Sequence, residues 1–141
     1  MYRDWDPNTP YKVCSRSTGA CMTAPTASGG KVTLANTTGA LNQQWYVTRV
    51  NPSQYRICSA SSGLCVVPAS GTAAALLQAP YTGATNQLWT IQPHDGAYGY
   101  YFNCSVTSSL CAAVTGTAPG TIENDAFHTI SAQQWSITPL R

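Results

Sequence analysis

The residues of this chain that are best suited to bind a ligand lie close together in the segment 121–129. Glu123, Asp125 and Phe127 alternate along that segment, so they share one face if the segment is a strand. We expect Gln133 to lie near that face. An aromatic ring offers an apolar platform and carboxylates accept hydrogen bonds, a combination typical of a site for a polar ligand. The alternative is an ordinary solvated strand face.

The same two carboxylates raise the question of catalysis. An acid and a base for glycoside hydrolysis stand about 5–9.5 Å apart, and alternate residues of one strand are about 6.5–7 Å apart. Nothing in the sequence, however, points to the burial that would turn one carboxylate into a general acid. Because the chain has only five carboxylates and two histidines, we expect no catalysis, no cofactor and no metal.

Length and composition exclude several other classes of protein. The chain has 141 residues, enough for one domain with a sizeable core. Only 9% of its residues are charged, against about a quarter in ordinary soluble domains. The net charge is +2 without a basic cluster, so we expect no nucleic-acid partner. No apolar run approaches the roughly 20 residues of a membrane span.

The six cysteines fall into three pairs, each enclosing six residues. Zinc sites have two to four residues between their ligands, often with a nearby histidine. We therefore predict three disulfides, each tying a strand–turn–strand hairpin, with free thiols or a metal site as the alternatives. Disulfides indicate an extracellular, secreted protein, and the lack of an apolar leader predicts a mature form or an excised module. The pairs are Cys14 with Cys21, Cys58 with Cys65, and Cys104 with Cys111.

The cysteine pairs belong to a longer repeat, which reads Tyr-x2-Cys-Ser-x5-Cys-x21-Gln-x-Trp and occurs three times without an insertion. The copies begin at Tyr11, Tyr55 and Tyr101, so the period is 44 and then 46 residues. We predict a single domain over residues 1–141, made of an N-terminal arm and three repeats. The arm is 1–10, and the repeats are 11–52, 53–98 and 99–141.

Within each repeat the hydrophobic residues alternate with polar ones, which predicts strands. Three units of about four strands, none able to cover its own apolar face, should close into one threefold core. Asn103 occupies the strand position of Val13 and Ile57, where an inward amide would need hydrogen-bond partners. Trp5 and Tyr98 either close the bottom of the barrel or join Tyr100 and Tyr101 in an aromatic patch for a protein partner.

The three Gln-x-Trp motifs and their hairpin cysteines resemble the ricin B-type family over residues 11–139. The resemblance implies an all-β, β-trefoil fold of twelve strands with pseudo-threefold symmetry. It implies that Trp45, Trp89 and Trp135 belong to the core, and that each motif Gln braces a turn beside a shallow pocket. It also implies carbohydrate binding at up to three sites, and no catalysis.

The sequence departs from this family where sugar is expected to bind. Sugar-binding copies carry an Asp two residues after the second hairpin cysteine, but Thr23, Val67 and Ala113 stand there. The Asn before Gln-x-Trp is Asn42 and Asn86, and Ala132 in the third repeat. Tyr81 follows the family's usual aromatic position by two residues. The candidates are Asn42 and Gln43 in repeat one; Tyr81, Asn86 and Gln87 in repeat two; and Glu123, Asp125, Phe127 and Gln133 in repeat three.

We therefore predict a non-catalytic carbohydrate-binding lectin or module with a non-standard sugar site. Its partners would be glycans or glycoconjugates. The alternative is a protein-binding β-trefoil, such as a hydrolase inhibitor or a targeting module, that has lost sugar binding.

Overall fold

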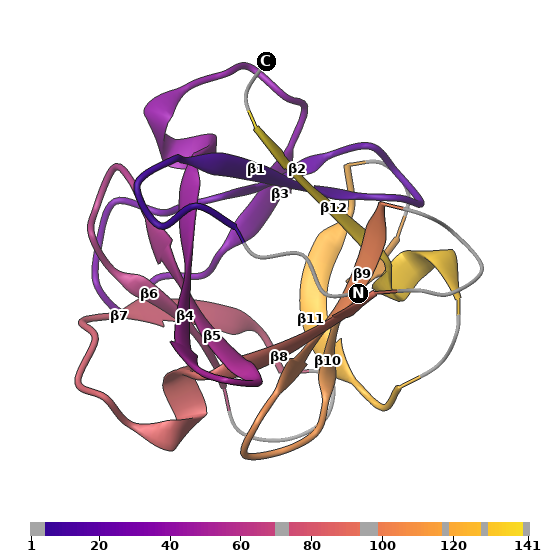
Figure 1. Ribbon diagram of the computed structural model, residues 1–141. Coiled ribbons are helices and arrows are strands. Elements are labelled where there is room, and N and C mark those ends of the chain that lie inside the picture. The colour runs from indigo at the N-terminus through magenta and orange to yellow at the C-terminus, as the bar shows by residue number, and fades with distance from the viewer. Residues whose placement is uncertain (1–4, 70–73, 94–98, 117–118, 128–129, 140–141) are drawn as a thin grey trace.

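The computed structural model describes residues 5–69, 74–93, 99–116, 119–127 and 130–139. Within them the chain forms twelve strands and three short 3-10 helices, arranged as three units around a common centre (Figure 1). Repeat one contains β1 (Tyr11–Ser15), β2 (Cys21–Thr23), β3 (Thr33–Ala35), η1 (Leu41–Gln43) and β4 (Trp45–Asn51). Repeat two contains β5 (Gln54–Ser59), β6 (Cys65–Pro68), β7 (Leu76–Ala79), η2 (Thr85–Gln87) and β8 (Trp89–Pro93). Repeat three contains β9 (Tyr100–Ser105), β10 (Cys111–Thr115), β11 (Thr121–Asp125), η3 (Ser131–Gln133) and β12 (Trp135–Pro139).

The first and last strands of the repeats form a closed ring. β1 pairs with β12 and β4, β5 pairs with β4 and β8, and β9 pairs with β8 and β12. Inside each repeat the pairing joins the motif tyrosine to the motif tryptophan, which explains their constant separation of 34 residues. The pairs are Tyr11 with Trp45, Tyr55 with Trp89, and Tyr101 with Trp135.

The middle strands of each repeat form a hairpin at one end of this barrel. β2 pairs with β3, β6 with β7, and β10 with β11. Isolated bridges join the hairpins to one another, at Lys31 with Leu77 and at Ala75 with Glu123. A six-stranded barrel with three hairpins is a β-trefoil, so the predicted fold is confirmed.

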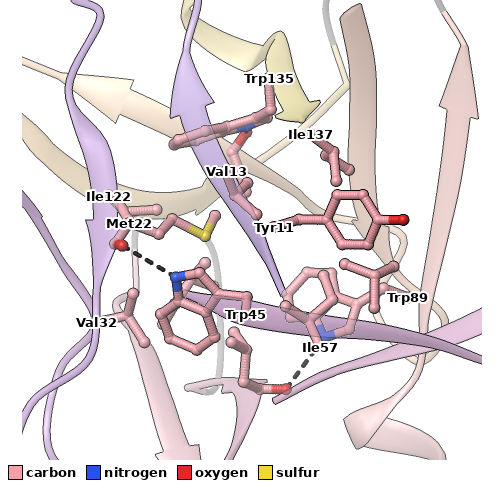
Figure 2. Close-up of a cluster of buried hydrophobic side chains, with 14 of the residues drawn as sticks. Tyr11, Val13, Met22, Val32, Trp45, Ile57, Trp89, Ile122, Trp135 and Ile137 are labelled. Atoms are coloured by element: carbon pink, nitrogen blue, oxygen red, sulfur yellow. Dashed lines mark hydrogen bonds between the residues drawn. The ribbon is translucent and has the colours of Figure 1, made fainter. Parts of the chain in front are cut away.

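The three motif tryptophans are the largest fully buried side chains among the described residues. Their exposed fractions are 0% for Trp45, 1% for Trp89 and 0% for Trp135. Each indole N–H donates to the carbonyl oxygen of the residue after the second hairpin cysteine, at 3.0 Å in all three repeats. Figure 2 shows the bond from Trp45 to Met22. The motif tryptophans therefore fix the fold and are closed to solvent.

All six cysteines form the three predicted disulfides. The bonded residues face one another across the first and second strands of each repeat, where Cys58 pairs with Cys65, for example. The five-residue loop between these strands turns through a residue with positive φ. That residue is Gly19 (77°) in repeat one, Gly63 (74°) in repeat two and Ser109 (63°) in repeat three.

The described part of the N-terminal arm covers one end of the barrel. Trp5 is 5% exposed, and its ring meets those of Tyr55 and Tyr101 edge-on at centroid distances of 5.4 and 5.2 Å. Tyr100 lies beneath Arg16, whose guanidinium carbon is 4.8 Å from the ring centroid. These aromatics therefore do not form the exposed patch considered as an alternative, and Tyr98 lies outside the described residues. Among the residues that the structure describes, no helix is long and apolar enough to cross a membrane.

Candidate functional site

Two hollows of the same construction lie on the barrel wall. The Tyr81 pocket, of about 480 Å³, lies between β4, the β5–β6 hairpin and Tyr81. The Phe127 pocket, of about 340 Å³, lies between β8, the β9–β10 hairpin and Phe127. Phe127 follows Tyr81 by 46 residues, which is the period from the second repeat to the third. The two pockets are therefore copies of one site in successive repeats.

Each pocket has a disulfide in its wall. Cys58 and Cys65 line the Tyr81 pocket, and Cys104 and Cys111 line the Phe127 pocket. The serine after the first cysteine, Ser59 or Ser105, lines the same wall. Each disulfide thus fixes the hairpin that forms one side of a pocket. The cysteine spacing predicted the disulfides and the hairpins, but not their place in a pocket wall.

Tyr81 is half-buried and is accompanied by two further side chains that the sequence analysis missed. Arg56 lies over the Tyr81 ring, with its guanidinium carbon 4.6 Å from the centroid. Tyr46, on β4 of the preceding repeat, lines the same pocket. The pocket therefore combines two aromatic rings with one cation. Alternation along β4 and β5 was the available signal, because it directs both residues outward.

Phe127 is 48% exposed, which makes it one of the most exposed large hydrophobic side chains described. Its ring meets the buried Phe102 ring edge-on at a centroid distance of 4.9 Å. Phe127 follows the end of β11 by two residues. The strand alternation that was expected to align Phe127 with Glu123 and Asp125 therefore ends at Asp125.

The structure keeps Glu123 and Asp125 on the outward face of β11 and places Phe127 beyond the end of that strand. Glu123 lines a third hollow, of about 250 Å³, between β3 and β11, together with Lys31. There it receives a long hydrogen bond of 3.4 Å from the Thr115 hydroxyl. The Asp125 carboxylate accepts the N–H of Ala126 at 2.8 Å. Glu123 and Phe127 thus line different pockets.

The three motif glutamines are buried, with exposed fractions of 3% for Gln43, 3% for Gln87 and 0% for Gln133. The Gln87 carbonyl accepts the N–H and hydroxyl of Thr82 at 2.8 and 3.2 Å, and its amide donates to Pro80 at 2.7 Å. Gln43 holds Thr38 and Asn36 in the same way. Gln133 donates to the carbonyl oxygen of Ala126 at 2.7 Å. These amides therefore brace the turn before each motif, as the resemblance implied.

The two motif asparagines lie on the adjoining 3-10 helices. Asn42 is half-buried on η1, and its backbone carbonyl accepts the N–H of Ala24 at 2.7 Å. Asn86 is exposed on η2. The residues that line the two copied pockets come instead from the barrel strands, the hairpins and the segments after β7 and β11.

The sequence profile of the ricin-type beta-trefoil lectin domain-like family matches residues 3–74 and 41–122. Together these ranges cover most of the chain. The protein belongs to this family. A comparison with curated proteins found no significant match.

Solved structures show the same fold in designed and natural proteins. The designed three-fold symmetric protein ThreeFoil has a TM-score of 0.85 and 24% identity, over 93% of this chain and 99% of its own. An exo-β-1,3-galactanase from Clostridium thermocellum has a TM-score of 0.87 and 20% identity, over 99% of this chain and 32% of its own. The Polyporus squamosus lectin, bound to a human-type influenza-binding epitope, has a TM-score of 0.83 and 17% identity. That match covers 97% of this chain and 51% of the lectin.

These identities are low, so the structural likenesses bear on the fold alone. The chain spans about a third of the galactanase and about half of the Polyporus lectin. This ricin-type domain is thus similar both to a free-standing trefoil and to parts of larger chains.

Proposed function

We propose that this domain is a secreted, non-catalytic carbohydrate-binding lectin or module, and that Tyr81 and Phe127 are its sugar platforms. Family membership supports glycan binding, and two structural neighbours are a lectin and a carbohydrate-active enzyme. The three disulfides suit an extracellular setting.

The observation that carries the proposal is the repetition of one pocket with an aromatic residue at the same position. Tyr81 and Phe127 occupy equivalent positions, and each borders a concave wall with hydroxyl groups. A sugar ring stacks its C–H face on an aromatic side chain while its hydroxyls bond to polar neighbours. The third equivalent position carries Thr37, which offers no such face. We therefore expect two working sites.

A binding role without catalysis agrees with the placement of the carboxylates. Glu123 lies beside Lys31 in its own hollow, and Asp125 bonds to the backbone that follows it. The lining of the Tyr81 and Phe127 pockets contains no described Asp or Glu. A glycosidase requires an acid and a base on either side of the bond that it cleaves. The two copied pockets are therefore proposed as binding sites.

The proposal is tested on a glycan array with the wild-type protein and the Tyr81→Ala/Phe127→Ala double variant. We expect the wild type to bind at least one glycan class. The affinity of the double variant for that class should be lower by about tenfold or more, because each substitution removes an apolar platform. Thermal unfolding of both proteins checks that the fold is intact.

Thr37→Ala is the matched control, because it alters the equivalent position of repeat one and should leave glycan binding unchanged. Equal binding by the wild type and the double variant would show that the platforms are assigned wrongly. A blank array, together with capture or inhibition of a protein, would favour the protein-binding alternative.

A further inference from the structure

The two copied pockets share a frame but differ in charge. In the register of the repeats, Arg56 of the Tyr81 pocket corresponds to Phe102 beside the Phe127 pocket. Tyr46 corresponds in the same way to Thr90. The Tyr81 pocket therefore presents the Arg56 guanidinium and two tyrosine rings. The Phe127 pocket presents the exposed Phe127 ring, which packs against the buried Phe102 ring.

The fold holds Arg56 in place. Its side chain leaves the outward face of β5, where the flanking Tyr55 and Ile57 are 1% and 2% exposed and point into the core. The guanidinium then lies over the Tyr81 ring at 4.6 Å. A planar cation stacked in this way loses less conformational freedom when it forms further hydrogen bonds.

No described carboxylate neutralises this cation inside the pocket. The acidic residue in the described part of the arm is Asp6, which precedes the lining residues Pro7 and Asn8. Its carboxylate oxygens accept the Asn8 N–H at 2.9 Å and the Thr9 hydroxyl at 3.0 Å, and so fold back onto the arm. Among the described residues, none accepts a hydrogen bond from the Arg56 guanidinium.

A guanidinium with free N–H groups is suited to a planar or tetrahedral oxyanion, which it can bind with two parallel hydrogen bonds. The adjacent tyrosine rings favour a ligand that also has an apolar face. We propose that the Tyr81 pocket is specific for acidic sugars and binds their carboxylate or sulfate group through Arg56. The Phe127 pocket, which lacks this cation, accepts neutral sugars. The inference rests on the proposed carbohydrate binding and names the ligand class of one of its two sites.

The test uses an array that carries uronic-acid, sialic-acid and sulfated oligosaccharides beside their neutral counterparts. We expect acidic glycans to bind the wild type about tenfold more strongly than the matched neutral ones. Arg56→Gln should remove that difference. Because the contact is ionic and partly exposed, raising the salt to about 0.5 M should weaken it. Carboxylated and sulfated members of the array show which anion is preferred.

Lys12→Gln is the matched control. Lys12 holds the position of Arg56 in repeat one, so the substitution removes the same charge from the repeat that carries Thr37 at the platform position. It should leave the preference for acidic glycans unchanged, which separates a local contact from an effect of net charge. An equal loss of preference in Lys12→Gln and Arg56→Gln would overturn the inference.

The possible failures are distinguishable. If only neutral glycans bind, or if Arg56→Gln keeps the full preference for acidic ones, the acidic-sugar site is refuted and the proposed lectin function stands. If neither acidic nor neutral glycans bind, both proposals fail, and Arg56 serves only to cover Tyr81.

Discussion

At the scale of single residues, Asn103 breaks the symmetry of the core. It is 1% exposed, and neither its amide nitrogen nor its amide oxygen has a partner among the described residues. The equivalent positions in the other repeats hold Val13 and Ile57, which are buried and apolar. A buried amide without hydrogen bonds costs free energy on folding, because it leaves water without compensation.

We therefore expect Asn103→Val to increase the free energy of unfolding by about 1–3 kcal/mol. Urea denaturation, followed by tryptophan fluorescence, measures the change. Val13→Asn, the reverse exchange at the equivalent position, should decrease stability. A loss of stability in Asn103→Val would show instead that the amide is paired with a buried water molecule.

At the scale of the elements, the three disulfide hairpins are nearly identical but one of them is strained. Ser109 has a φ of 63°, whereas glycine occupies the same turn position at Gly19 and Gly63. A residue with a side chain resists the left-handed conformation, and glycine adopts it without steric cost. The β9–β10 hairpin therefore closes at a cost that the other two hairpins avoid.

Ser109→Gly should raise the free energy of unfolding by about 1 kcal/mol, because it relieves this backbone strain. Thermal unfolding at matched concentrations measures the shift. The control is Ser108→Gly, one residue earlier, which should give no such gain. If both variants behaved alike, strain at residue 109 would not be the cause.

The elements could be predicted from the sequence because the repeat recurs without insertions from Tyr to Trp. That register and the alternation within each copy identified the strands, the hairpins and the disulfides, and the family resemblance implied the buried tryptophans. The pockets could not be found in the same way, because each one combines strands of two successive repeats. Tyr46 and Arg56 face the same hollow from β4 and β5, although they belong to different copies. Reading one repeat at a time places them in separate units.

The site also depends on where a strand ends. Alternation placed Phe127 beside Glu123, but β11 ends at Asp125 and the chain then turns Phe127 onto Phe102. A tertiary contact with another strand thus decides the direction of the side chain. Local periodicity carries no information about such a contact.

At the scale of the whole molecule, the arm completes the barrel. Trp5 packs edge-on against the motif tyrosines of the second and third repeats, and Pro7 and Asn8 continue into the wall of the Tyr81 pocket. The segment outside the repeats therefore joins two of them and borders one candidate site.

Trp5→Ala should lower the free energy of unfolding by about 3–5 kcal/mol, the usual cost of deleting a buried tryptophan side chain. Calorimetry or chemical denaturation tests this expectation. Trp5→Phe, which keeps a ring against Tyr55 and Tyr101, should retain most of the stability. Wild-type stability in Trp5→Ala would mean that the arm merely rests on a barrel that is already closed.

The closed ring also affects how the chain folds as it is synthesised. β1 pairs with β12 along its full length, from Tyr11 with Pro139 to Ser15 with Trp135. On the ribosome the first strand emerges long before its partner, so it waits with an open hydrogen-bonding edge. Two nascent chains that meet in this interval can pair through these open edges, and this risk ends only when the last strand takes its place.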